Sequence, residues 1–141
     1  MALYIVPITE YDQSNSNRYA RRMLIKPSLL LHIEGGALFA LSILFYQRSH
    51  GSWALFAATF LAPDLLMAGY LINEQVGAAL YNLVHTVTAP VIVLAAGALT
   101  SQRAAIALAL IWAAHIGFDR LLGYGLKYPT NFKDTHLHRV R

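Results

Sequence analysis

An imidazole and a carboxylate stand four residues apart inside an apolar stretch of the chain, at His115 and Asp119, and Arg120 follows at once. Residues four apart lie on the same face of an α-helix, so both side chains would point in the same direction. Burying such groups among apolar side chains is costly unless they find partners. We therefore expect other parts of the chain to bring polar groups to this face.

Other apolar stretches carry ionisable residues that would meet this face, above all Asp64 and His85. The chain has no cysteine, which excludes disulfides, zinc–thiolate sites, iron–sulfur clusters and thiol nucleophiles. Imidazole and carboxylate groups form a nitrogen and oxygen ligand set that suits zinc, manganese, iron or nickel. The His-x3-Asp spacing supplies two ligands from one helix turn. We predict a divalent ion (zinc, manganese or iron) bound by Asp64, His85, His115 and Asp119, where it would lower the pKa of a bound water.

Three further residues are candidates for catalytic roles: Glu34, Arg120 and His136. Glu34 or His136 would act as an additional ligand or as a general base. Arg120 would hold a phosphate or carboxylate group of a lipid-like substrate through two parallel hydrogen bonds. The alternative is that Glu34 pairs with Arg120 and that His136 lies in solvent.

The composition indicates what kind of element would hold these groups. Of the 141 residues, 57% are hydrophobic and only 13% are charged, whereas about 25% are charged in an average soluble domain. The net charge is +4, and the basic residues flank the apolar stretches. Flanking basic residues orient membrane helices. We therefore expect an integral membrane protein whose partners are a membrane lipid or an amphipathic small molecule, and not nucleic acid.

Four apolar segments have about the 20 residues needed to cross a hydrocarbon core of about 30 Å. They cover approximately residues 27–46, 52–72, 75–99 and 103–124. Short connectors make consecutive helices antiparallel neighbours, so we predict an all-α protein with an antiparallel bundle of four transmembrane helices. The bundle would occupy residues 20–128, between a flexible N-terminal tail (1–19) and a basic C-terminal tail (129–141) that would fold back over the site.

An even number of crossings places both termini on one side, and most basic residues lie on that side. The positive-inside rule then predicts that both termini are cytoplasmic, with the protein in the inner (plasma) membrane. At about 1.5 Å per residue, five ionisable side chains lie roughly 12–18 Å from the cytoplasmic ends of their helices. These five are Glu34, Asp64, His85, His115 and Asp119. Ionisable groups at one depth on four helices predict one shared site.

Local features around these residues also favour a shared site. Pro63 would kink the second segment just before Asp64. Asn82 and Tyr81 precede His85 by three and four residues, so they lie near its face of the helix. Tyrosines near segment ends are typical of membrane interfaces. We interpret four of them in this way: Tyr70, Tyr81, Tyr124 and Tyr128.

Several motifs of the chain resemble one protein family. They are Pro63-Asp64-Leu65-Leu66-Met67-Ala68-Gly69-Tyr70, Tyr81-Asn82-x-x-His85, the run from His115 to Tyr128, and Phe132-Lys133-Asp134-Thr135-His136-Leu137. Over about residues 24–138 the chain resembles the DUF4260 family of small bacterial membrane proteins. This resemblance implies a membrane-helical fold and no particular activity, because the function of that family is unknown. The layout is also distantly similar to that of the YdjM-type membrane-bound metal-dependent hydrolases, which favours hydrolysis among metal chemistries.

The same residues leave other functions open. His85 and His115 would serve as axial ligands of a b-type haem in an electron carrier. The carboxylates and imidazoles would form a relay in a proton- or ion-coupled transporter, which would need a homo-oligomer because one four-helix bundle is small for alternating access. In a structural or partner-binding subunit they would affect stability alone. Our leading interpretation is a metal-dependent membrane hydrolase that acts on a lipid-like or amphipathic substrate in the cytoplasmic half of the bundle.

Overall fold

The computed structural model describes residues 26–140. The predicted tail (1–19) and the first residues of the predicted transmembrane domain (20–25) lie outside the described residues. The expectation of an all-α protein is confirmed, because the described chain consists of helices and their connectors. In chain order the elements are α2 (Pro27–Arg48), α3 (Trp53–Thr59), the 3₁₀ helix η1 (Ala62–Leu71), α4 (Glu74–His85), α5 (Thr88–Leu99), α6 (Arg103–Leu122) and α7 (His136–Arg139).

Four helical segments are long and apolar enough to cross a membrane, as the sequence predicted. They are Pro27–Arg48, Trp53–Leu71, Glu74–Leu99 and Arg103–Leu122. Large apolar side chains point outward from them, and Leu65, Leu71 and Leu99 are 73%, 90% and 88% exposed. Such extensive outward apolar surface suits hydrocarbon and not water. The fold is therefore that of a multi-pass membrane protein.

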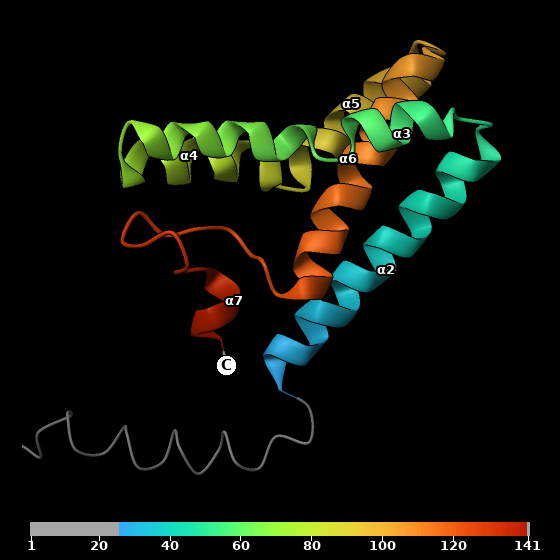
Figure 1. Ribbon diagram of the computed structural model, residues 1–141. Helices are drawn as coiled ribbons and strands as arrows, with labels where there is room; N and C mark the ends of the chain where they lie inside the picture. The colour runs from blue at the N-terminus through green and yellow to red at the C-terminus, as the bar shows by residue number, and fades with distance from the viewer. Residues whose placement is uncertain (1–25, 141) are drawn as a thin grey trace, which may run out of the picture.

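Helix α6 is the best-buried element of the described fold, with α2 and α5 packed along it (Figure 1). Helix α2 runs antiparallel to α6: Gly35 of α2 lies against Arg120, whereas Tyr46, near the other end of α2, packs with Ala107. Gly97 of α5 faces the beginning of α6. Small residues at these contacts allow helix backbones to approach closely, as is common between membrane helices. This packing fixes the orientation of the α6 face that carries His115.

The second and third membrane segments are each interrupted ahead of a proline. Proline has no N–H to donate to the carbonyl four residues earlier, and its ring clashes with that carbonyl. Helix α3 ends at Thr59, four residues before Pro63, and the segment continues as η1. Thr86, four residues before Pro90, is extended (φ −80°, ψ 136°) between α4 and α5. The kink near Pro63 was expected, whereas the single helix expected over about 75–99 is two helices because of Pro90.

The two breaks turn η1 and α4 away from the axis of α2 and α6, and η1 and α4 pack against each other (Figure 1). A β-carbon added at Gly69 of η1 would lie 3.2 Å from the α-carbon of Gly77 in α4, so these backbones are in close contact. A 3₁₀ helix as long as η1 is uncommon, and 3₁₀ stretches within helices often mark functional regions. The pair brings the beginning of η1 and the end of α4 to the middle of α6.

The chain after α6 returns toward α4. Helix α6 ends at Leu122 and is capped by Gly123, whose left-handed φ of 93° suits a residue without a β-carbon. The following segment runs back to the short helix α7 (Figure 1). Asn82 of α4 binds it at two points: the amide nitrogen donates to the Lys127 carbonyl (2.8 Å) and the amide oxygen accepts from the Lys127 N–H (2.7 Å). These bonds hold the C-terminal segment against α4, three residues before His85.

Candidate metal centre

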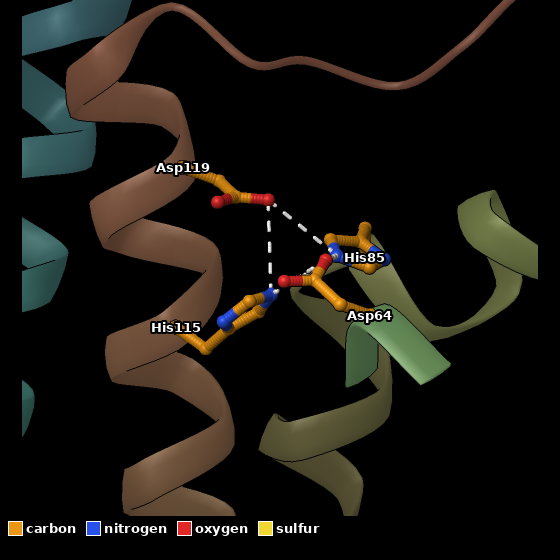
Figure 2. A group of neighbouring side chains, drawn as sticks. All are labelled: Asp64, His85, His115 and Asp119. Carbon is orange, nitrogen blue, oxygen red and sulfur yellow. Dashed lines mark hydrogen bonds and ion pairs between the residues drawn. The ribbon is translucent and has the colours of Figure 1, made fainter. Parts of the chain in front are cut away.

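The four predicted metal ligands converge on one point of the structure (Figure 2). Asp64 lies in the first turn of η1, His85 is the last residue of α4, and α6 contributes His115 and Asp119. One potential ligand atom from each residue lies within 4.8 Å of those from the other three. The expectation that separate membrane segments bring these groups together is therefore correct for these four residues.

Five of the six distances between ligand atoms in this His/Asp cluster are close to those between the ligands of one metal ion. The Nε2 atoms of His85 and His115 are 3.1 Å apart. His85 Nε2 lies 3.4 Å from Asp64 Oδ1 and 3.5 Å from Asp119 Oδ2, and the corresponding distances from His115 Nε2 are 3.5 Å and 3.7 Å. Ligands about 2.0–2.2 Å from a shared metal in tetrahedral geometry are roughly 3.3–3.6 Å from one another. The residues present thus fit a divalent ion.

A hydrogen bond from His85 Nδ1 to the backbone leaves Nε2 of the same ring facing the cluster. His85 Nδ1 lies 2.8 Å from the Tyr81 carbonyl oxygen. A carbonyl oxygen can only accept, so Nδ1 carries a hydrogen, and when the ring is neutral Nε2 presents its lone pair to the cluster. An imidazole held in this way by a backbone carbonyl is the usual arrangement for a metal-ligating histidine.

No lysine or arginine among the described residues forms an ion pair with Asp64 or Asp119. If the imidazoles are neutral and the carboxylates ionised, two formal negative charges face each other at the cluster. His85 and His115 are 3% and 1% exposed, so little water screens them. The buried Nδ1 of His115 also has no hydrogen-bond partner in the described part of the chain. A divalent cation would neutralise the carboxylates and hold both Nε2 atoms at their short separation.

The two carboxylates form the open side of the cluster. The Asp64 and Asp119 side chains are 29% and 15% exposed, whereas both imidazoles are buried. A crevice too narrow to hold a water molecule lies between His85, Asp119, Arg120 and the segment that begins at Tyr124. The site is therefore enclosed on its imidazole side and partly exposed at its carboxylates.

Two further residues support the cluster: Tyr81, which its spacing places near the face of His85, and Lys127, which was not expected at the site. The Tyr81 hydroxyl donates to Asp119 Oδ2 (3.1 Å), and the Tyr81 ring stacks on His85 with centroids 3.6 Å apart. Tyr81 is only 2% exposed, so its assignment to a membrane interface is wrong. Lys127 places its Nζ over the Tyr81 ring, 4.8 Å from the centroid. Burial lowers the pKa of Lys127, and the carboxylates of Asp119 and Asp64 oppose this shift.

The three predicted catalytic residues lie outside the four-residue cluster. Glu34 has an exposed side chain on α2. Arg120 is adjacent to Asp119 in α6 and so points about 100° away from it, toward Gly35 of α2, although it lines the crevice described above. The His136 ring accepts at Nδ1 from the Leu126 N–H (2.9 Å) and is therefore held by backbone. The catalytic roles assigned to Glu34, Arg120 and His136 stay predictions.

Comparison with known proteins identifies the family of the chain. The family model described as "Domain of unknown function (DUF4260)" matches residues 28–140 of the chain. The chain belongs to the DUF4260 family. No curated protein and no solved structure matches it. The range matched by DUF4260 includes the whole His/Asp cluster and α7, whereas the likeness to metal-dependent hydrolases stays a prediction.

The sequence of this DUF4260 chain contains partial evidence for the two supporting residues, Tyr81 and Lys127. Tyr81 precedes His85 by four residues, which places both on one helical face. That spacing indicates contact with the site, but the preference of tyrosine for membrane interfaces obscured it. Lys127 stands at the end of a membrane segment, where a basic residue usually orients the helix. Its burial among aromatic rings depends on the returning C-terminal segment, which no local pattern reveals.

Proposed function

We propose that this protein is an integral membrane enzyme that uses a divalent metal ion to hydrolyse an amphipathic substrate. The observation that carries the proposal is the convergence of Asp64, His85, His115 and Asp119, with ligand atoms 3.1–3.7 Å apart for the five pairs that involve an imidazole. When bound, the ion would polarise the scissile group and activate water. Zinc, manganese and iron all accept this set of nitrogen and oxygen ligands.

Each residue of the site would have a separate role in binding the ion or the substrate. The buried imidazoles of His85 and His115 would hold the ion, because neutral rings with fixed orientation bind without adding charge. The partly exposed carboxylates would complete the ligand set and face the incoming substrate. Arg120, which lines the crevice to His85 and Asp119, would bind an anionic group of the substrate as it enters from the cytoplasmic leaflet.

The geometry disfavours the haem alternative. Axial ligands of a haem lie on opposite sides of the porphyrin plane, which would have to pass between the two Nε2 atoms of His85 and His115. These atoms are 3.1 Å apart, and carboxylate oxygens of Asp64 and Asp119 lie within 3.7 Å of them. The acidic groups occupy the space that an apolar macrocycle would need.

The metal content of the purified protein tests the proposal. After a wash with a weak chelator, we expect about one tightly bound divalent ion per chain by elemental analysis. The variant His115→Ala should lose it, because removal of one of four ligands leaves an incomplete site. His50→Ala is the matched control, since His50 is exposed and lies outside the cluster. Equal metal contents in wild type and His115→Ala would contradict the metal site.

Hydrolysis requires its own measurement. We expect the metal-loaded protein in mixed micelles to cleave at least one member of a panel of long-chain acyl esters and phospholipids. The release of product should stop on chelation, return on addition of zinc or manganese, and be absent in His115→Ala. Stoichiometric metal with no cleavage across the panel would argue against hydrolysis while leaving the metal site intact.

One observation favours a second function, an ion- or proton-coupled transporter. Asp64 and His85 lie beside the interruptions before Pro63 and Pro90, and discontinuous helices supply the ion and substrate sites of many transporters. In this case Asp119→Asn would abolish proton or ion flux into liposomes, and chelators would leave the wild-type flux unchanged. Flux that depends on bound metal, or no flux at all, would favour the enzyme.

A further inference from the structure

An apolar cavity lies directly beside the His/Asp cluster. Its volume is about 340 Å³, which falls within the range of about 300–1,000 Å³ of small-molecule sites. Its walls come from the junction of α3 and η1, from the end of α4 and from the first half of α6. None of the four cluster residues lines the cavity, so it is distinct from the candidate metal centre.

The cavity continues the face on which the cluster lies. Pro63 in its wall directly precedes Asp64, and Val84 directly precedes His85. On α6, Ile111 and Leu108 line the cavity four and seven residues before His115, which places them on the same helical face. At about 1.5 Å per residue, the cavity extends roughly 10 Å along α6 from the cluster, away from Gly123.

The polar groups in the walls are already occupied. The Trp112 indole N–H donates to the Val84 carbonyl (2.6 Å), which the break between α4 and α5 leaves without the N–H of a continuous helix. The hydroxyl of Thr59 donates to the Leu55 carbonyl of its own helix (2.8 Å). A polar ligand would therefore find few hydrogen-bond partners in this cavity, whereas a hydrocarbon has no polar group that would be left without one.

The rim of the cavity opens on the outer surface of the membrane segments. Leu108 at the rim is 44% exposed, and Leu61 and Leu65, which directly precede the wall residues Ala62 and Leu66, are 61% and 73% exposed. In a bilayer this surface faces lipid hydrocarbon. A chain from the bilayer would therefore reach the cavity without crossing water, and two residues of the cavity wall, Pro63 and Val84, directly precede Asp64 and His85 of the cluster.

We propose that this cavity binds the hydrocarbon chain of the substrate, with the polar group to be cleaved at the His/Asp cluster. This inference rests on the proposed function and names the substrate class: an amphiphile with one long unbranched chain that follows the α6 face from Leu108 to His115. Trp112 forms a fixed wall because its hydrogen bond joins α6 to the interrupted third segment. Ala62, at the beginning of η1, lies where a larger side chain would shorten the cavity.

A series of n-alkyl hydroxamates, from acetohydroxamate to dodecanohydroxamate, tests the inference on zinc-loaded protein. The hydroxamate head binds zinc, so affinity reports where the chain lies. We expect wild-type affinity to rise by up to about fourfold per added methylene until the cavity is full. In Ala62→Phe we expect unchanged affinity for acetohydroxamate and at least a tenfold loss for dodecanohydroxamate.

The matched control is Ala68→Phe, which makes the same change on η1 at an exposed position outside the cavity. Its affinities should follow the wild type at every chain length, which corrects for partition of the probes into detergent. Should Ala62→Phe fail to fold by circular dichroism and size exclusion, Leu66→Trp fills the cavity from the next turn of η1. Parallel chain-length profiles for Ala62→Phe (or Leu66→Trp) and Ala68→Phe would overturn the inference.

A second arm separates failure of the cavity from failure of the metal site. A dodecyl chain that carries a diazirine and no metal-binding group should crosslink to peptides containing Leu108 or Trp112, with or without zinc. Ala62→Phe should suppress this crosslink, and Ala68→Phe should not. If the wild-type protein binds no metal but still gives the crosslink, the proposed function is overturned and the cavity inference is not. If it binds metal but gives no crosslink in the cavity, the cavity inference alone is overturned.

Discussion

At the scale of single residues, the His/Asp cluster depends on groups that orient its ligands. Tyr81 contributes its carbonyl to His85 Nδ1, its hydroxyl to Asp119 and its ring to the face of His85. One side chain and its backbone thus constrain two ligands that come from different helices. Residues that bind metal ligands in this manner typically change metal affinity by about 10–100-fold when mutated.

The hydroxyl of Tyr81 can be removed without loss of the ring. Tyr81→Phe keeps the stack on His85 and the backbone bond, but the Asp119 carboxylate loses its 3.1 Å hydrogen bond. We expect metal affinity to fall by about 10–100-fold, as competition with a chromogenic chelator would measure. The thermal unfolding of the metal-free protein should change little.

Tyr70→Phe provides the matched control for this prediction. The buried Tyr70 hydroxyl has no hydrogen-bond partner among residues 26–140, and Tyr70 belongs to the same membrane region. Its removal should leave metal affinity unchanged. Equal affinities for Tyr81→Phe and wild type would show that the bond to Asp119 does not support a bound ion.

At the scale of elements, the contact between α2 and α6 holds the helix that supplies two of the four ligands. A β-carbon at Gly35 would lie 2.6 Å from the β-carbon of Arg120 and 2.7 Å from the backbone nitrogen of Leu121. Backbone atoms cannot yield, so Gly35→Ala should force the helices apart and lower the free energy of unfolding by about 1–3 kcal/mol. Thermal or denaturant-induced unfolding in detergent measures this loss.

The neighbouring Gly36→Ala is the control. A β-carbon there would meet only the tip of the Leu121 side chain, at 3.2 Å, and that tip can rotate away. Because alanine favours helix over glycine by up to about 1 kcal/mol, this variant should be neutral or slightly more stable. A Gly35→Ala protein as stable as Gly36→Ala would contradict the close backbone contact.

The sequence predicted the convergence of the four cluster residues from a count that assumes straight α-helices of constant rise, although η1 is a 3₁₀ helix and η1 and α4 turn away from the axis of α6 (Figure 1). A count of residues from each segment end gives a depth, and equal depths for Asp64, His85, His115 and Asp119 indicate a common level. The shape of the path between them was harder to predict. The interruption at Thr86 depends on Pro90 four residues later, and a proline also fits the first turn of a helix that begins anew. The pattern alone does not distinguish a kink from a break.

The C-terminal segment marks another limit of sequence reasoning. Its return was expected, but its contacts arise from pairings between positions far apart in the chain, such as Asn82 with Lys127. His136 was expected to close the site or to lie in solvent, and its ring accepts a hydrogen bond from the Leu126 N–H, which the sequence did not predict. One backbone N–H within reach can set the orientation of a histidine ring, and no periodicity in the sequence predicts that contact.

At the scale of the whole molecule, the two ends of the helices differ in charge. Arg48 at the end of α2 and Arg103 at the beginning of α6 line one pocket, so the connectors beside them lie at the same end. Lys26 and Lys127 lie at the opposite ends of these antiparallel helices, and Lys133 and Arg139 lie in the described segment that follows Lys127. The positive-inside rule then predicts a cytoplasmic C-terminus and places the His/Asp cluster in the cytoplasmic half of the membrane.

Because the natural chain has no cysteine, single cysteines can report this orientation without a background. We introduce Ser49→Cys in the connector after α2 and Asn131→Cys in the segment before α7, two exposed positions. In intact cells a membrane-impermeant maleimide should label Ser49→Cys and should label Asn131→Cys only after the cells are broken open. Labelling of Asn131→Cys alone in intact cells would reverse the orientation. The carboxylates of the cluster would then open toward the outer leaflet, and the substrate would have to enter from that side.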